Sequence, residues 1–173
     1  PADAASLSGM QIPYPGASEN VHHEAELVVA IGTGGADISV ETALDHVWGF
    51  AAGNDLTRRD LQAEAKASRR PWDMSKGFDN SAIIGLLSPR SVTGDMTHGA
   101  ITAHVDGELR QTGDLSEMIW PTAGVIAYLS TLVTLAPGDL IMTGTPAGVG
   151  AIARGQTCRV DIDGLAPATV TLA

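Results

Sequence analysis

Short apolar segments separated by turns run the length of this chain, and they do not alternate regularly with amphipathic helical stretches. The turns draw on 20 glycines and 9 prolines among 173 residues. A doubly wound nucleotide-binding sheet requires regular strand–helix alternation, which this pattern lacks. We therefore predict a β-rich α+β fold. Its core must consist mainly of Val, Ile, Leu and Ala, because aromatic residues make up only 4% of the chain.

Length, charge and cysteine content narrow the class of protein. The chain is long enough for one domain with a substantial core, so we expect residues 1–173 to form a single domain. The formal net charge of −10 argues against a nucleic-acid or anionic-membrane partner, since both require a basic patch. No segment approaches the roughly 20 apolar residues of a membrane span. The single cysteine, Cys158, excludes an internal disulfide and indicates a reducing, cytoplasmic setting, with an inert buried thiol favoured over a nucleophile.

Local patterns predict where the strands and helices lie. Asp106-Gly107 suits the positive φ angles of a type I′ turn between strands at 100–105 and 108–111. Thr57 is the expected N-cap of a helix over 58–67, with Asp60 in the capping-box position. We further expect strands at 22–31, 48–54, 81–87 and 140–143, two strands around Asp163-Gly164, helices at 41–47 and from Pro121 to Leu132, and an ordered loop at 70–80.

Two glutamates occupy alternate positions in the predicted strand 22–31. Because side chains alternate across a strand, Glu24 and Glu26 point to one face about 7 Å apart. The opposite face, from Ala25 to Ile31, is apolar and must meet the core. Two like charges at the edge of an apolar surface repel each other, and either water or a cation relieves that repulsion. The pair alone leaves both an exposed polar strand face and a metal site open.

Asp55 follows the second predicted strand and supplies a third carboxylate, although an Asp before a helix can also serve as a cap. Three carboxylates with no nearby cysteine form a hard-oxygen site suited to Mg²⁺ or Mn²⁺, with Ca²⁺ as a further option. Zn²⁺ is disfavoured because the only nearby nitrogen donors are His22 and His23. Three carboxylates leave about half of an octahedral shell open to a substrate.

Polar side chains suited to an anionic substrate occur in three further segments. Arg59 and Gln62 share a face of the predicted helix, although a solvated face is the simpler interpretation. Lys76 lies in an irregular stretch, either at the surface or anchored to contact a carboxylate. The run 143–150 lacks the Gly-Lys-Ser/Thr ending of a phosphate loop, so we reject nucleotide binding there. Its backbone amides and the Thr145 hydroxyl could still bind a carboxylate.

Five motifs, in order along nearly the whole chain, resemble the fumarylacetoacetate hydrolase family. Within that family, the segments 53–62 and 70–79 look most like fumarylpyruvate hydrolases and their acylpyruvase relatives. The five motifs are His-His-Glu-Ala-Glu-Leu (22–27), Gly-Asn-Asp-Leu-Thr-Arg-Arg-Asp-Leu-Gln (53–62), Arg-Pro-Trp-Asp-Met-Ser-Lys-Gly-Phe-Asp (70–79), Asp-Gly-Glu-Leu-Arg-Gln-Thr-Gly-Asp (106–114) and Pro-Gly-Asp-Leu-Ile-Met-Thr-Gly-Thr-Pro-Ala-Gly-Val-Gly (137–150).

The resemblance implies a mixed β-sheet roll, usually a homodimer, that forms one catalytic domain. It implies a metal-dependent hydrolase of carbon–carbon bonds, which splits a 2,4-diketo acid such as fumarylpyruvate into pyruvate and a carboxylic acid. The positions that match Glu24, Glu26 and Asp55 bind Mg²⁺ or Mn²⁺ in the family.

Four further positions match the family's substrate contacts: Arg59, Gln62, Lys76 and Thr145. Lys76 and Gln62 would stabilise the oxyanion formed when water attacks the 4-carbonyl, or orient that water. Arg59 would pair with a carboxylate of the substrate.

The family also carries a water-activating His–Glu pair in an N-terminal segment that often folds over the site as a lid. Nothing in residues 1–21 matches this pair, and we expect that segment to lie upstream of residue 1. A decarboxylase or isomerase of an oxaloacetate-like or aromatic-degradation keto acid is the alternative, because these reactions need no attack by water. Outside catalysis, the alternative is a metal-stabilised binding protein.

Overall fold

The computed structural model describes residues 1–173 and contains three β-sheets. The strands are β1 (Ala5–Leu7), β2 (Met10–Ile12), β3 (Val21–His23), β4 (Ala25–Ile31), β5 (Val47–Asp55), β6 (Thr57–Arg58), β7 (Ala82–Ile84), β8 (Ser88–Pro89), β9 (Ala100–Val105), β10 (Glu108–Asp114), β11 (Leu140–Met142), β12 (Gly150–Ala151), β13 (Thr157–Ile162) and β14 (Ala168–Leu172). The first sheet has the order β1-β7-β5-β4-β11, with β8 paired to β5. The second has the order β10-β9-β13-β14-β2, and the third β12-β3-β6.

The two larger sheets are mixed, as predicted. β1 pairs with β7 and β2 with β14 in parallel, whereas the other strand pairs are antiparallel. Four α-helices and three 3₁₀ turns complete the fold, which confirms a strand-rich α+β class. They are α1 (Arg59–Ala67), α2 (Asp73–Lys76), α3 (Arg90–Thr93), α4 (Thr122–Leu132), η1 (Ala2–Ala4), η2 (Ala43–His46) and η3 (Leu115–Glu117).

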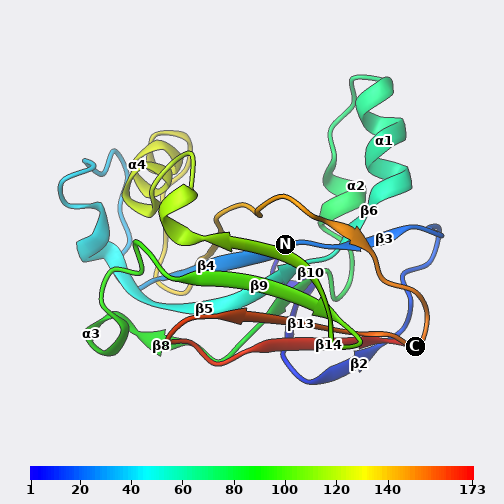
Figure 1. Cartoon of the computed structure of the whole chain (residues 1–173). Helices are drawn as coiled ribbons and strands as arrows, with labels where there is room; N and C mark the ends of the chain where they lie inside the picture. Colours follow the sequence, from blue (N-terminus) through cyan, green and yellow to red (C-terminus); the bar gives the residue numbers. More distant parts are fainter.

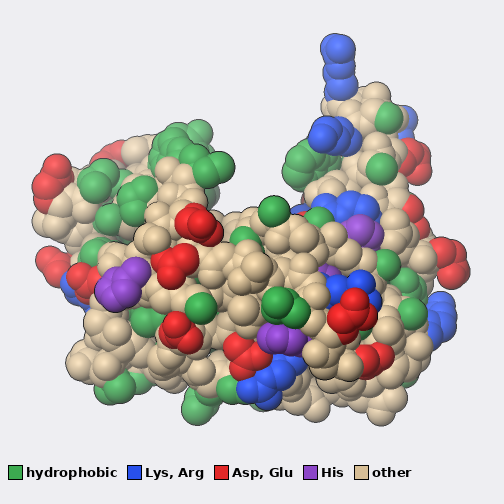
Figure 2. Space-filling view, viewed as in Figure 1, with side chains coloured by type: hydrophobic (Ala, Val, Ile, Leu, Met, Phe, Trp, Pro, Cys, Tyr) green, Lys and Arg blue, Asp and Glu red, His purple; other side chains and the backbone are tan.

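The molecule is saddle-shaped. Figure 1 shows α1 and α2 rising at one end of the sheets and α4 rising at the other. Figure 2 shows the hollow between these two projections on the molecular surface. The segment that joins β11 to β12, orange in Figure 1, crosses the floor of this saddle. None of the helices has the length and apolar character needed to cross a membrane.

The main hydrophobic core lies between the two larger sheets. Leu27 of β4 and Phe50 of β5 enter it from one sheet, and Val160 of β13 and Val170 of β14 from the other; all four are at most 1% exposed. The opposite face of β4 carries Val28, which packs in a separate small cluster. The apolar face predicted for residues 25–31 is confirmed, and Glu26 alternates with it on the same face of β4 as Val28.

Phe50 makes a large expected contribution to stability, because it is the largest fully buried side chain of the core. Phe50→Ala should lower the free energy of unfolding by about 3–5 kcal/mol through lost burial and an internal cavity. Trp48, on the same strand, is 48% exposed and provides a control, since Trp48→Ala should cost much less. Urea denaturation measures both values, and equal losses would contradict this description of the core.

The predicted strand 22–31 is broken at Glu24, which the sequence pattern did not indicate. β3 pairs with β6 and β12 in the third sheet, whereas β4 pairs with β5 and β11 in the first. The Glu24 N–H donates to the side-chain oxygen of Asn54 on β5 at 3.0 Å instead of to a backbone carbonyl of a neighbouring strand. The chain therefore changes sheets at this residue.

The other predicted elements are largely confirmed. The hairpin turn has positive φ at Asp106 (50°) and Gly107 (83°), as a type I′ turn requires. Helix α4 follows Pro121 and ends at Leu132. The helix expected at 41–47 is the shorter 3₁₀ turn η2, and the stretch 70–80 contains the one-turn helix α2.

The capping box predicted at Thr57 is wrong. Thr57 is fully buried and pairs with His22 in the third sheet, and its hydroxyl donates to the Asp55 carbonyl. Helix α1 begins after Arg58 with no side-chain cap. The Asp60 carboxylate instead accepts hydrogen bonds from the Ser18 hydroxyl at 2.7 Å and the Glu19 N–H at 2.9 Å. The contact of Asp60 with residues 18 and 19 has therefore replaced the predicted local contact with Thr57.

Candidate metal centre

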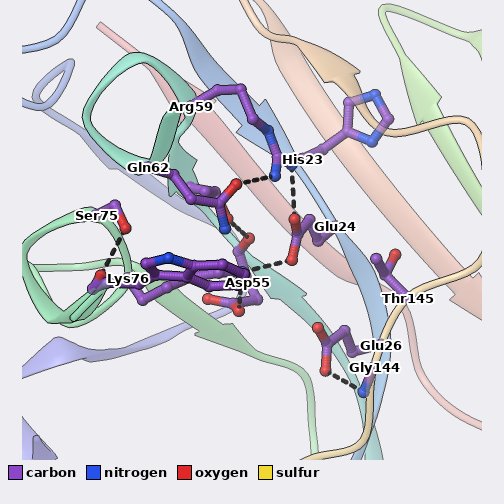
Figure 3. A network of polar contacts seen from close by, with 12 residues as sticks. His23, Glu24, Glu26, Asp55, Arg59, Gln62, Ser75, Lys76, Gly144 and Thr145 are labelled. Atoms are coloured by element: carbon purple, nitrogen blue, oxygen red, sulfur yellow. Dashed lines mark hydrogen bonds and ion pairs between the residues drawn. The ribbon is translucent and has the colours of Figure 1, made fainter. Parts of the chain in front are cut away.

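Antiparallel pairing of β4 with β5 brings the three predicted carboxylates together. Glu26 lies opposite Gly53 in the register, and the Asp55 N–H donates to the Glu24 carbonyl oxygen at 2.9 Å. One carboxylate oxygen from each of Glu24, Glu26 and Asp55 lies within 4.8 Å of the other two. Glu24 and Glu26 therefore share one face, as predicted, despite the break in the strand (Figure 3).

Glu24 and Glu26 are buried and Asp55 is partly buried, which excludes the exposed polar strand face. Glu24 and Glu26 are 7% and 4% exposed. Burial raises the pKa of Glu26 to about 8, although the Gly144 N–H donates to this carboxylate at 2.7 Å and opposes the rise. Buried carboxylates this close favour neutralisation by a proton or a cation. Three oxygen donors without sulfur suit a hard divalent cation such as Mg²⁺ or Mn²⁺.

The raised pKa of Glu26 predicts pH-dependent metal binding. Below about pH 8 this carboxyl holds a proton that a bound cation must displace. Mn²⁺ affinity should therefore rise with pH, by up to about tenfold per unit between roughly pH 6 and 8, and level off above that range. Isothermal titration in buffers of different ionisation enthalpy measures the affinity and the released proton together. A pH-independent affinity with no proton release would contradict a protonated Glu26.

Two cations lie against the carboxylate cluster. The Lys76 ammonium donates to Glu24 at 2.5 Å and to Asp55 at 2.6 Å. Arg59 donates to the other Glu24 oxygen at 2.6 Å, and its second terminal nitrogen donates to Gln62 at 2.6 Å. Burial works against the charge on Lys76, but the Asp55 and Glu24 carboxylates outweigh it and raise the Lys76 pKa.

The structure thus brings Arg59, Gln62 and Lys76 to the predicted metal ligands. Arg59 and Gln62 share a face of α1, as the spacing predicted, and Lys76 is anchored at the end of α2. Sequence reasoning missed that both cations are direct ion-pair partners of the carboxylates. That role depends on how α1 and α2 pack against each other and against β6, which no local pattern reveals.

Thr145 lies on the other side of the cluster. It directly follows Gly144, whose N–H donates to Glu26. Figure 3 shows Thr145 beside Glu24 and Glu26, across the carboxylates from Lys76. The predicted site residues therefore surround one position, with two cations on one side and a hydroxyl on the other.

Two buried amide side chains next to the cluster were missed. Asn54 accepts the Glu24 N–H, as described above, and donates to the Cys158 sulfur at 3.3 Å. Gln111 donates to the Thr145 hydroxyl oxygen at 2.8 Å. Each is 1% exposed. Their only signal in the sequence is a polar residue inside a motif, which does not distinguish a buried amide from an exposed one.

Cys158 and the two histidines lie outside the cluster of potential ligands. Burial raises the pKa of the Cys158 thiol to about 12, so the thiol is protonated and inert, as predicted. His22 contacts the Asn20 side-chain oxygen at 2.9 Å, and His23 contacts Gln111 at 2.8 Å.

A protein-family model for the C-terminal part of fumarylacetoacetate (FAA) hydrolase matches residues 1–173. The chain belongs to the fumarylacetoacetate hydrolase family. Within this family it is 39% identical over 165 residues to a fumarylpyruvate hydrolase from Ralstonia sp, covering 95% of this chain and 85% of that one. It is 40% identical over 154 residues to a mitochondrial oxaloacetate decarboxylase from Dictyostelium discoideum, covering 89% and 71%.

A solved structure from the same family is also similar. It is the fumarylpyruvate hydrolase from Pseudomonas aeruginosa in complex with Mn²⁺ and pyruvate, with a TM-score of 0.96 and 48% sequence identity. The similarity covers 100% of this chain and 76% of that one. Relatives of this chain within the family thus include a hydrolase and a decarboxylase.

Proposed function

We propose that this protein is a metal-dependent hydrolase that cleaves the carbon–carbon bond of a 2,4-diketo acid, fumarylpyruvate or a related acylpyruvate, to give pyruvate and a carboxylic acid. The observation that carries the proposal is the cluster of the buried Glu24 and Glu26 with the partly buried Asp55, with Lys76 and Arg59 on one side. The similarity to the Ralstonia and Pseudomonas aeruginosa fumarylpyruvate hydrolases supports the choice of substrate.

Glu24, Glu26 and Asp55 would hold Mg²⁺ or Mn²⁺ in this proposal. The bound cation would supply Lewis-acid stabilisation of the negative charge that develops on the keto-acid oxygens. The burial of Glu24 and Glu26 strengthens such electrostatic effects, because little water is present to screen them.

The polar side chains around the carboxylates would bind and orient the substrate. The Lys76 ammonium would donate to the oxygen that gains charge when water attacks the 4-carbonyl. Gln62 holds the Arg59 guanidinium through their 2.6 Å hydrogen bond and can orient the attacking water. Arg59 would pair with a substrate carboxylate, and Thr145 would bind the carboxylate end of the keto acid from the opposite side.

A second candidate function is decarboxylation of an oxaloacetate-like acid. The observation that favours it is the 40% identity to the Dictyostelium oxaloacetate decarboxylase. Decarboxylation also needs no general base to activate a water, and we assign no residue of this chain to that role. The same carboxylates and cations would serve this reaction, because it too builds negative charge on a keto acid.

The proposal is tested by pyruvate release in the presence of Mg²⁺ or Mn²⁺, with the protein carrying its natural N-terminus. We expect metal-dependent release of pyruvate from fumarylpyruvate, maleylpyruvate or acetylpyruvate, and much slower release from oxaloacetate. Ultraviolet absorbance monitors each reaction. The reverse order would favour the decarboxylase. A metal-dependent melting temperature without turnover of any of these acids would indicate a binding protein.

A further inference from the structure

Gln111 is a polar residue whose side chain is buried, unlike the other side chains of strand β10. It is 1% exposed, and it is the only fully buried residue of β10. The pairing of β10 with β9 shifts register between Leu109 and Gln111, as a β-bulge does when it redirects a side chain. Gly148, at φ 100°, lets the segment after β11 approach this point, since a Cβ there would lie 2.5 Å from the Arg110 carbonyl oxygen.

All four hydrogen-bonding positions of the Gln111 amide are used. Its oxygen accepts from the Ala25 N–H at 3.1 Å and contacts His23 Nδ1 at 2.8 Å. Its nitrogen donates to the Pro146 carbonyl oxygen at 2.8 Å and to the Thr145 hydroxyl oxygen at 2.8 Å. The Ala25 N–H can only donate and the Pro146 carbonyl can only accept, so the orientation of the amide is fixed by backbone groups at both ends.

This orientation determines how the Thr145 hydroxyl is used. The Gln111 nitrogen has no lone pair to offer, so Thr145 Oγ1 must act as the acceptor in their hydrogen bond. The Thr145 O–H is then free to donate elsewhere, and no other hydrogen bond within the chain involves it. Thr145 lines a cavity of about 570 Å³ together with Thr143, Gly144 and several residues of the segment 112–120. Figure 3 shows Thr145 beside Glu24 and Glu26, and its neighbour Gly144 donates to Glu26, so Thr145 both lines this cavity and lies next to the carboxylates.

We infer that Gln111 is a positioning residue, which makes the Thr145 hydroxyl an obligatory donor to an anionic oxygen of the bound keto acid. This inference rests on the proposed function, in which Thr145 contacts the substrate. Gln111 does not touch the substrate itself. Its fixed amide selects a ligand that offers an acceptor, such as a carboxylate oxygen, at the Thr145 position, and disfavours one that offers a donor there.

The alternative is that Gln111 only fills space and links β4 to the segment after β11. Both roles predict that its loss lowers stability, so stability cannot separate them. They differ in whether the effect of Gln111 on ligand binding passes through the Thr145 hydroxyl. A double-mutant cycle measures that coupling.

The experiment uses Mn²⁺-loaded protein and pyruvate as the probe, with binding followed by isothermal titration. Gln111→Glu keeps the size and the acceptor toward Ala25, but its ionised carboxylate would accept from Thr145 and turn that hydroxyl away from the site. Gln111→Met provides a second variant that removes the donor without adding charge. Thr145→Val removes the hydroxyl, and Thr145→Ser keeps it. Melting temperature and Mn²⁺ affinity are recorded for every variant, so that only folded, metal-loaded proteins enter the cycle.

We expect Thr145→Val to weaken pyruvate binding by about 10–100-fold, the typical loss for a hydrogen bond to a charged group. Each Gln111 variant should weaken binding by a comparable factor in the wild-type background. In the Thr145→Val background each should cost no more than about threefold, whereas in the Thr145→Ser background the full effect of Gln111 should return.

The outcomes separate the inference from the function on which it rests. If Thr145→Val leaves pyruvate affinity unchanged, the substrate contact in the proposed function is wrong. If Thr145→Val weakens binding but the Gln111 variants cost the same factor in both backgrounds, Thr145 contacts the ligand and the positioning role of Gln111 is overturned.

Discussion

Glu26→Gln is expected to abolish Mn²⁺ binding and turnover together while leaving the fold intact. Affinity should fall by more than about 100-fold, because even residues that merely orient a metal ligand cost about 10–100-fold when they are removed. Glutamine keeps an oxygen that can accept the Gly144 N–H, so the loss of charge is the main change. Isothermal titration with Mn²⁺ and the pyruvate-release assay measure the two effects.

Without metal, Glu26→Gln should not lose stability. Burial and the neighbouring carboxylates disfavour a negative charge on Glu26, so a neutral glutamine should keep or raise the metal-free melting temperature above about pH 8. Glu64→Gln, at an exposed position of α1, is the matched control. It should change neither the Mn²⁺ affinity nor the metal-free melting temperature. Retention of wild-type Mn²⁺-dependent turnover by Glu26→Gln would rule out Glu26 as a ligand.

Lys76→Met is expected to lower turnover by about 10²–10³-fold without preventing metal binding. The basis for this magnitude is the loss of one charged donor to the oxygen that gains negative charge during the reaction. Mn²⁺ affinity should be retained or increase, because Lys76 no longer competes for the Glu24 and Asp55 oxygens that it contacts at 2.5 and 2.6 Å. Initial rates at saturating Mn²⁺ separate this effect from metal binding.

Lys76→Met should also change stability in a way that depends on the metal. Without Mn²⁺, Glu24 and Asp55 lose a shared counter-ion, so the melting temperature should fall. Mn²⁺ should restore most of that loss by taking over the neutralisation. Lys66→Met, at an exposed position on α1, is the control. A variant that kept wild-type turnover would remove Lys76 from the catalytic residues, whereas one that lost Mn²⁺ affinity would indicate that Lys76 organises the carboxylates.

The carboxylate cluster could be predicted because its cause is local. Alternation along a strand puts Glu24 and Glu26 on one face, and the apolar stripe on the other face fixes which side meets the core. Asp55 could be added because it ends the neighbouring strand. The hairpin at Asp106-Gly107 was predictable for the same reason, since positive φ at both residues is a local requirement.

The missed features depend on contacts between distant segments. The chain changes sheets at Glu24 because Asn54, thirty positions away, accepts its N–H. Thr57 is buried in a strand pair instead of capping α1, since His22 lies opposite it. Gln111 is an anchor only because the segment after β11 folds back onto β10. Spacing along the chain carries no information about such partners, so the sequence reveals these residues only as polar positions inside motifs.

The most direct test of the metal site is the anomalous scattering of a crystal of this protein grown with Mn²⁺ and pyruvate. The proposal predicts an anomalous difference peak with carboxylate oxygens of Glu24, Glu26 and Asp55 about 2.0–2.3 Å away, the range expected for a small divalent cation. A well-ordered site that holds no manganese, or a peak bound by other residues, would contradict the proposal.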